Sequence, residues 1–306
     1  MKTGSFLRRF TLSMVCALMI SSFGYAMKPA LAEPETGTLT KTTWLWHTQL
    51  IQTSPAELLE FSESQGIDII YLQISTKVQP ASYKSFIRQA GEKGIEVHAL
   101  NGAPDWALAT SKPKLDAFIK WINDYQATAA PNEKLKGIHV DIEPYLLPQW
   151  KTDWASLVGQ WQKNVDDLVE QAKAAELPLS AALPFWLDND NYKVPDSDQT
   201  LSSWMISRFE SVTLMSYRDN ASAIYNTAKG ELLEGERLNK KVYTGVETKP
   251  SSEGNFITFY EEGNGVLNEQ MLELEKLAST HSSFGGIAVH DLVGWMDLVQ
   301  RDKPIN

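Results

Sequence analysis

Eight short runs that are apolar, or that alternate apolar and polar residues, recur along this chain of 306 residues. They cover residues 43–47, 68–75, 95–101, 137–143, 179–184, 211–217, 242–246 and 286–290. Strands that alternate with helical segments form parallel βαβ units. Eight such units in a chain of this length favour a closed barrel over an open doubly wound sheet. No glycine-rich phosphate-binding fingerprint follows the first run. The sequence therefore predicts an α/β fold that consists of a single (β/α)8 TIM barrel.

The segments between these runs carry helix start and stop signals. Ser54, Pro55 and Glu57 form a capping box with proline at the first helical position. Pro178 stops the longest helical pattern, 154–175. Further helices are expected over 114–125, 268–280 and 292–300. The loops 187–200 and 248–264 are the expected long insertions on the active face.

The N-terminus has the organisation of an export signal. Lys2, Arg8 and Arg9 precede the apolar run 10–20, and small residues end at Ala32, which predicts cleavage after that residue. The apolar run is too short for a comfortable membrane span, so we expect a secreted or extracytoplasmic protein without a stable membrane anchor. An uncleaved anchor is the alternative. The expected organisation is a signal peptide over 1–32, a linker over 33–41 and the barrel domain over 42–306.

Composition narrows the classes of partner. The one cysteine, Cys16, lies in the signal, so disulfides cannot stabilise the mature chain, which needs a large core instead. Removing the signal with its four Lys and Arg residues takes the formal net charge from −10 to −14. This acidity argues against nucleic acid or an anionic membrane as a partner. The sequence leaves the oligomeric state open.

The run from Gly137 to Tyr145 is the most distinctive stretch for function. Its period of two places His139, Asp141 and Glu143 on one face of a strand. Burying three titratable side chains costs free energy unless they are paired or solvated. Two neighbouring carboxyls also raise one pKa, as a general acid requires, and Glu143 is the natural acid. A solvated edge strand, a metal site or a structural ion pair is the alternative. His139, which lies deeper, is expected to be a hydrogen-bonded core residue.

In a TIM barrel the active site lies at the C-terminal ends of the strands. Here these ends carry carboxylates, amides and indoles, which bind sugar hydroxyls and stack on sugar rings. The candidate substrate-binding residues are Trp44, Trp46, Gln73, Asn101, Trp106, Tyr145, Trp186, Met215, Arg218, Glu247 and His290. Trp295 is a further candidate stacking platform. Scattered histidines are weak evidence for a metal, so neither a metal nor a cofactor is expected.

The fourth run resembles the signature of glycoside hydrolase family 18, the chitinase-like barrels, which reads Asp-Gly-x-Asp-x-Asp-x-Glu. Gly137, Asp141 and Glu143 match it, whereas Lys136 and His139 replace family aspartates. The Met-x-Tyr of the family is similar to residues 215–217, and 180–184 resembles its fifth strand. The family usually has aspartate at the position of Arg218 and tryptophan at the position of His290.

This resemblance implies a glycoside hydrolase that cleaves a β-linked glycan containing N-acetylhexosamine, with retention and with assistance from the substrate. It implies Glu143 as the acid that protonates the leaving oxygen. It implies Asp141 as the group that orients the 2-acetamido group for attack on the anomeric carbon, and Tyr217 as a hydrogen-bond partner of that acetamido group. The implied catalytic residues are Glu143, Asp141 and Tyr217.

Two other interpretations stay open. Glu143 and Glu247 also resemble the acid and nucleophile of retaining barrels that use two glutamates about 5–5.5 Å apart, which act on neutral glycans. That group of enzymes has asparagine before the acid, whereas this chain has Ile142. The departures at Lys136, His139 and His290 also allow a carbohydrate-binding barrel without turnover.

Overall fold

The structure is a computed structural model that describes residues 39–302. The expected signal peptide, its cleavage after Ala32 and most of the expected linker lie outside the described residues. The first strand begins at Lys41, the last residue of the expected linker. Among residues 39–302, none of the helices combines the length and the apolar character needed to cross a bilayer.

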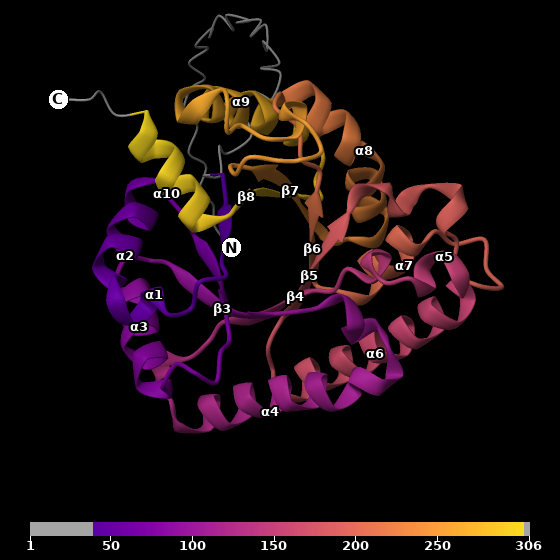
Figure 1. The fold of residues 1–306 in the computed structure, drawn as a ribbon, viewed down its shortest axis with the longest axis horizontal. Coiled ribbons are helices and arrows are strands. Elements are labelled where there is room, and N and C mark those ends of the chain that lie inside the picture. The colour runs from indigo at the N-terminus through magenta and orange to yellow at the C-terminus, as the bar shows by residue number, and fades with distance from the viewer. Residues whose placement is uncertain (1–38, 303–306) are drawn as a thin grey trace, which may run out of the picture. The chain divides into compact units, whose positions relative to one another are not determined.

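Eight parallel strands close into one barrel in sequence order, and β8 pairs with β1 (Figure 1). The strands are β1 (Lys41–Leu45), β2 (Ile69–Gln73), β3 (Glu96–Asn101), β4 (Gly137–Asp141), β5 (Leu179–Pro184), β6 (Ser211–Met215), β7 (Lys241–Glu247) and β8 (Phe284–His290). Each overlaps one of the eight runs expected from the sequence. The prediction of a (β/α)8 barrel is therefore confirmed.

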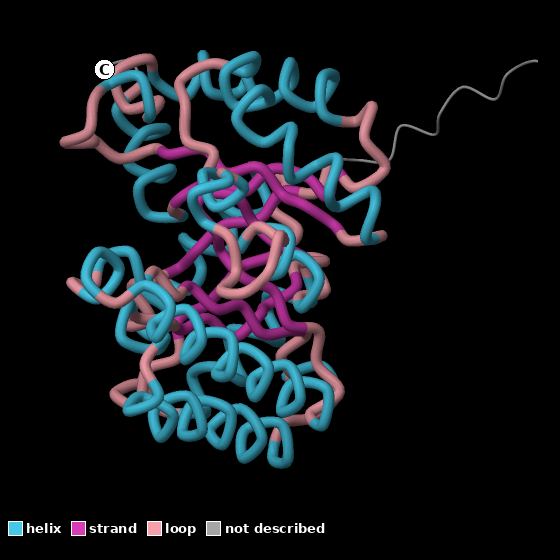
Figure 2. Tube along the Cα trace, turned by 90° about the vertical axis from the view of Figure 1, so that its right-hand side faces the viewer, coloured by secondary structure: helices cyan, strands magenta, loops and turns pink. Residues whose placement is uncertain are grey.

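Helices surround the barrel on its outside (Figures 1 and 2). They are α1 (Leu50–Thr53), α2 (Pro55–Ser64), α3 (Pro80–Glu92), α4 (Lys112–Thr128), α5 (Gln149–Thr152), α6 (Trp154–Ala174), α7 (Leu201–Arg208), α8 (Ala221–Leu238), α9 (Gly263–Ala278) and α10 (Leu292–Arg301). The sequence signals delimit α2, α4, α6, α9 and α10 but not α3, α7 or α8. Gly230 and Gly235 lie within α8 and weaken its helical pattern, because glycine has low helix propensity.

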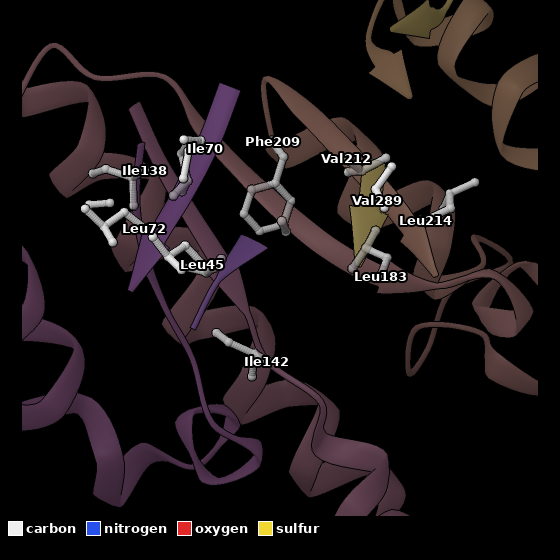
Figure 3. Close-up of a cluster of buried hydrophobic side chains, with 14 of the residues drawn as sticks. Leu45, Ile70, Leu72, Ile138, Ile142, Leu183, Phe209, Val212, Leu214 and Val289 are labelled. Carbon is white, nitrogen blue, oxygen red and sulfur yellow. The ribbon is translucent and has the colours of Figure 1, made fainter. Parts of the chain in front are cut away.

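The main hydrophobic core lies between the strands and the helices. The outward side chains Ile70, Leu72, Ile138, Val212 and Leu214 are almost fully buried there (Figure 3). At about 25 cal/mol per Å² of apolar surface, this layer is the dominant stabilising contribution in a chain without disulfides. Because successive side chains of a strand point to opposite faces, burial of these residues against the helices places the alternate residues inside the barrel.

The interior of the barrel is more polar and aromatic. Trp44, Tyr71 and Leu100 form a small separate cluster there with Ala182 and Ala288. His139 stacks on Tyr71, with ring centroids 3.8 Å apart, and its Nδ1 lies 2.8 Å from Ser180 Oγ. His139 thus occupies the hydrogen-bonded core position that the sequence predicts.

Strand β4 ends at Asp141, two residues before the expected end of the run. Glu143 precedes a single 3₁₀ turn, Pro144–Leu146. The backbones of Gly102 and Asp141 approach each other closely at this strand end, since a Cβ on Gly102 would lie only 1.8 Å from the carbonyl oxygen of Asp141. Only glycine therefore lets β3 and the end of β4 come so close together.

Candidate active site

A cavity of about 310 Å³ opens at the C-terminal ends of the strands. Strands β1, β4, β5, β6 and β8 and the loops that follow β4 to β7 supply its walls. Its lining residues are Trp44, Asp141, Glu143, Tyr145, Ala182, Pro184, Phe185, Trp186, Met215, Tyr217, Arg218, Glu253, Ile257 and His290. The site therefore lies where a TIM barrel places its active site.

Nine of the residues singled out from the sequence line this cavity: Trp44, Asp141, Glu143, Tyr145, Trp186, Met215, Tyr217, Arg218 and His290. Trp46 and Glu247 lie just behind the lining, because both contact His290. Their chemical roles remain predictions.

Four other candidates lie away from the cavity lining. Trp106 is buried in the outer core against Phe118, and Trp295 is fully buried, so neither ring is free to stack on a sugar. The side chain of Asn101 is occupied by backbone groups, since it donates to Ile74 O and accepts from Gly102 N–H. Gln73 lies beside Thr48, whose hydroxyl donates to its backbone oxygen. In an amphipathic pattern, an indole can either pack in the core or stack on a sugar. The sequence pattern therefore does not separate these two roles for Trp106 and Trp295.

The two carboxyls at the end of β4 influence each other. Burial, and then the negative charge of Glu143, raise the pKa of Asp141 to about 7, although His290 acts in the opposite direction. The Oδ1 atom of Asp141 is buried and has no hydrogen-bond partner in the described part of the chain. Asp141 can therefore hold a proton near neutral pH and is available to a bound ligand. The raised pKa thus falls on Asp141, whereas the sequence predicts it for the acid Glu143.

Glu143 accepts a hydrogen bond from the hydroxyl of Tyr145 on its Oε2 atom. Burial and the neighbouring charge of Glu143 raise the pKa of Tyr145, which keeps the phenol protonated and able to donate. The Tyr145 ring packs edge-on against Trp186, with centroids 5.1 Å apart. Glu143 is thus oriented by one neutral donor, and no cationic side chain within residues 39–302 forms a salt bridge with it.

Glu247, at the end of β7, has a contrasting environment. Its Oε1 atom accepts from the backbone N–H groups of Thr248 and Lys249, at 2.8 and 2.9 Å, and its Oε2 lies 2.8 Å from His290 Nδ1. Both oxygens are engaged and the side chain does not line the cavity. This geometry suits a carboxylate that orients His290 better than it suits a nucleophile.

His290 faces the cavity with its ring held from two sides. Trp46 Nε1 donates to its Nε2 at 3.3 Å, while Glu247 holds Nδ1. Burial alone would lower the pKa of His290, but the hydrogen bond and charge of Glu247 outweigh burial and raise it. Trp44 packs edge-on against this ring, at 5.4 Å between centroids.

Tyr217 and Arg218 follow β6 and line the cavity side by side. Burial, together with the surrounding carboxylates, raises the pKa of Tyr217, so its hydroxyl remains a donor. Gly245 on β7 makes room for this ring, because a Cβ there would lie 2.9 Å from its Cε1 atom.

Sequence reasoning did not find Glu253, Phe185 or Ile257 in the lining. Glu253 and Ile257 belong to loop 248–264, which was expected to be an insertion on this face, but no periodic pattern indicates which residue of a loop points inward. Phe185 follows directly on Pro184 at the end of β5 and could have been found by extending that strand by one residue.

No group of three or more His, Cys, Asp or Glu side chains within residues 39–302 has the geometry of a metal site. The cavity lining supplies titratable side chains of its own: Asp141 with a raised pKa, Glu143 beside it, Glu253, two phenols, an imidazole and a guanidinium. These groups can transfer a proton and stabilise a developing positive charge.

The closed barrel and its acidic cavity define a TIM barrel with the fold of the family 18 glycoside hydrolases. A chitinase from Chromobacterium violaceum superposes with a TM-score of 0.56 at 11% identity, over 86% of this chain and 98% of that chain. A family 18 chitinase from Pseudoalteromonas aurantia gives 0.55 at 13% identity, over 86% and 99%. A family 18 chitinase from Cycas revoluta, in complex with (GlcNAc)3, gives 0.53 at 14% identity, over 85% and 97%.

The chain matches no family model, and no curated protein sequence matches it. At such low identities the structural likeness establishes the fold. It therefore confirms the resemblance to chitinase-like barrels at the level of architecture. Any inference about activity has to come from the residues of the cavity.

Proposed function

We propose that this protein is a glycoside hydrolase that cleaves a β-linked glycan containing N-acetylhexosamine, and that it works outside the cytoplasm. The observation that carries this proposal is the pair Asp141 and Glu143, two neighbouring carboxyls, the first with a raised pKa, that line a cavity at the strand ends. The (GlcNAc)3 bound to the Cycas revoluta chitinase supports an acetamido sugar as ligand for this fold.

Glu143 acts in this proposal as the general acid that protonates the leaving glycosidic oxygen. Asp141 binds the acetamido N–H and turns the acetamido oxygen toward the anomeric carbon, which that oxygen attacks as the leaving group departs. Tyr217 donates to the acetamido oxygen and helps to hold it in line. Water then opens the cyclic intermediate with Glu143 as base, so the β configuration is retained.

The engaged state of Glu247 supports substrate assistance over the mechanism with two glutamates. A nucleophile must reach the anomeric carbon, but both oxygens of Glu247 already bind protein donors. Moving this carboxylate would leave two backbone N–H groups without their partner, at about 1–3 kcal/mol for each buried donor.

The test is an incubation of the wild-type protein and of Glu143→Gln with chitin oligosaccharides, peptidoglycan fragments and neutral glycans, with products read by mass spectrometry. We expect cleavage of acetamido glycans by the wild type alone. Cleavage confined to neutral glycans would contradict the substrate assignment, and glycan binding without any cleavage would make the protein a carbohydrate-binding barrel.

A further inference from the structure

Among residues 39–302, Arg218 and Arg301 form no salt bridge with an acidic side chain, and of these two arginines only Arg218 lines the cavity. Arg88, Arg208 and Arg237 each form a salt bridge with an acidic side chain. Arg218 lines the catalytic cavity, yet no acidic side chain in residues 39–302 forms a salt bridge with it. A guanidinium that stays charged and lacks a carboxylate beside it in a ligand cavity is suited to bind an anion.

Aromatic packing holds this guanidinium in place. Its central carbon lies 5.1 Å from the ring centroid of Phe185 and 5.8 Å from that of Phe256, and Nη1 donates to the carbonyl of Tyr217 at 2.6 Å. Cation–π contacts of this kind orient a guanidinium without neutralising it. With five N–H donors on the group, this leaves donors available to a bound carboxylate.

Arg218 carries a charge opposite to that of the carboxyls in the cavity. The β4 wall carries Asp141 and Glu143, whereas the β6 wall carries the guanidinium. His290 on β8 accepts from Trp46 at Nε2 and so does not supply a second fixed positive charge. Glu253 also lines the cavity, and its negative charge contributes to the raised pKa of Tyr145 in the loop after β4.

We propose, building on the proposed hydrolase function, that Arg218 recognises a carboxylate on the glycan, so that the substrate is an acidic N-acetylhexosamine glycan rather than neutral chitin. The carboxylate would belong to a sugar beside the cleaved bond and would form a charge-assisted, bidentate contact with the guanidinium. An acidic protein repels a densely charged polyanion at long range, and this favours a glycan in which charged and neutral sugars alternate.

Such a carboxylate has two chemical sources, a uronic acid or a lactyl ether on an N-acetylhexosamine. Binding is measured by calorimetry on the full-length Glu143→Gln protein, in which turnover is blocked. The first ligand is a β-linked tetrasaccharide in which N-acetylglucosamine alternates with its 3-O-lactyl ether. The second is a β-linked tetrasaccharide in which N-acetylglucosamine alternates with glucuronate. Each is compared with the same molecule after reduction of its carboxyl groups to alcohols.

We expect at least one carboxylate ligand to bind about tenfold more tightly than its alcohol, the scale of one hydrogen bond to a charged group. The preferred ligand identifies the source. Arg218→Met, which keeps the length of the side chain between the two rings, should remove the preference, and Arg218→Lys should retain part of it. The matched control is Arg208→Met, since Arg208 also lies over an aromatic ring, 4.8 Å from the Trp204 centroid, but outside the cavity.

Equal affinity for acid and alcohol, a preference that survives in a folded Arg218→Met protein, or no binding of either carboxylate ligand would overturn the proposal. Failure of the hydrolase function is a separate result. It would appear as absence of cleavage by the wild type while the binding preference for a carboxylate remains.

Discussion

The ends of β4 and β7 both carry carboxyls, but their environments differ. At β4, Asp141 has a raised pKa and an unpartnered oxygen, and Glu143 has a single phenol donor. At β7, Glu247 has three hydrogen bonds and lies behind His290. A carboxyl that is incompletely paired can exchange a proton with a ligand, whereas a fully paired carboxylate mainly fixes its neighbours. We therefore assign chemistry to β4 and positioning to β7.

The largest effect is expected from Glu143→Gln. The amide keeps the shape of the side chain but cannot donate an acidic proton to the leaving oxygen, so kcat should fall by about 10³-fold with a small change in KM. Steady-state kinetics on an N-acetyl oligosaccharide measures this. A loss of less than tenfold would remove Glu143 from its assigned role.

Asp141→Asn should reduce kcat by about 10²-fold, because a neutral amide cannot stabilise the positive charge that develops on the acetamido group. Kinetics on the same oligosaccharide provides the measurement. If Asp141→Asn cleaved the N-acetyl substrate at the wild-type rate, Asp141 would not contact the reacting group.

Gly102→Ala tests the backbone at the end of β4. The new Cβ would meet the carbonyl of Asp141, so the strand end must shift, and we expect a loss of about 1–3 kcal/mol in the free energy of unfolding together with reduced activity. Chemical denaturation measures the first effect. Gly159→Ala is the matched control, because a Cβ there meets no atom within 4 Å.

Asp141 also predicts a dependence of stability on pH. Its pKa is about 7 in the folded protein against 3.8 for the free side chain, so between these values the folded state keeps a proton that the unfolded state has lost. This contribution is fully present below the lower value and is lost as the pH rises through the upper one. Urea denaturation from pH 4 to 8 should show a shallower decline for Asp141→Asn than for the wild type. The exposed control Glu269→Gln should follow the wild type.

The smallest effect on turnover is expected from Glu247→Gln. Without the carboxylate, the pKa of His290 should fall, because the strongest opposition to burial is then removed and only the charge of Asp291 still raises it. NMR titration of the His290 ring measures this shift, and kcat should fall only several-fold. A loss as large as that of Glu143→Gln would instead place Glu247 in the chemistry and break the contrast between the two strand ends.

The sequence predicts the barrel well, because strands buried on both faces and helices with capping signals leave strong local patterns. Residues 137–143 likewise predict that Asp141 and Glu143 lie together, and both line the cavity although the strand itself ends at Asp141. The state of Glu247 could not be predicted, because its partners are backbone N–H groups at the start of a loop. The structure corrects the prediction for Trp106 and Trp295, which are buried, because an indole near a strand end fits both an outer core and a sugar platform.

The most direct test of the account is the response of the wild-type protein to a thiazoline analogue of N-acetylglucosamine, which mimics the cyclic intermediate of substrate assistance. If Asp141 and Glu143 act with the acetamido group of the substrate, the thiazoline should inhibit competitively. An inert thiazoline, together with a glycosyl adduct on Glu247 seen by mass spectrometry during turnover, would contradict the account and move the chemistry to β7.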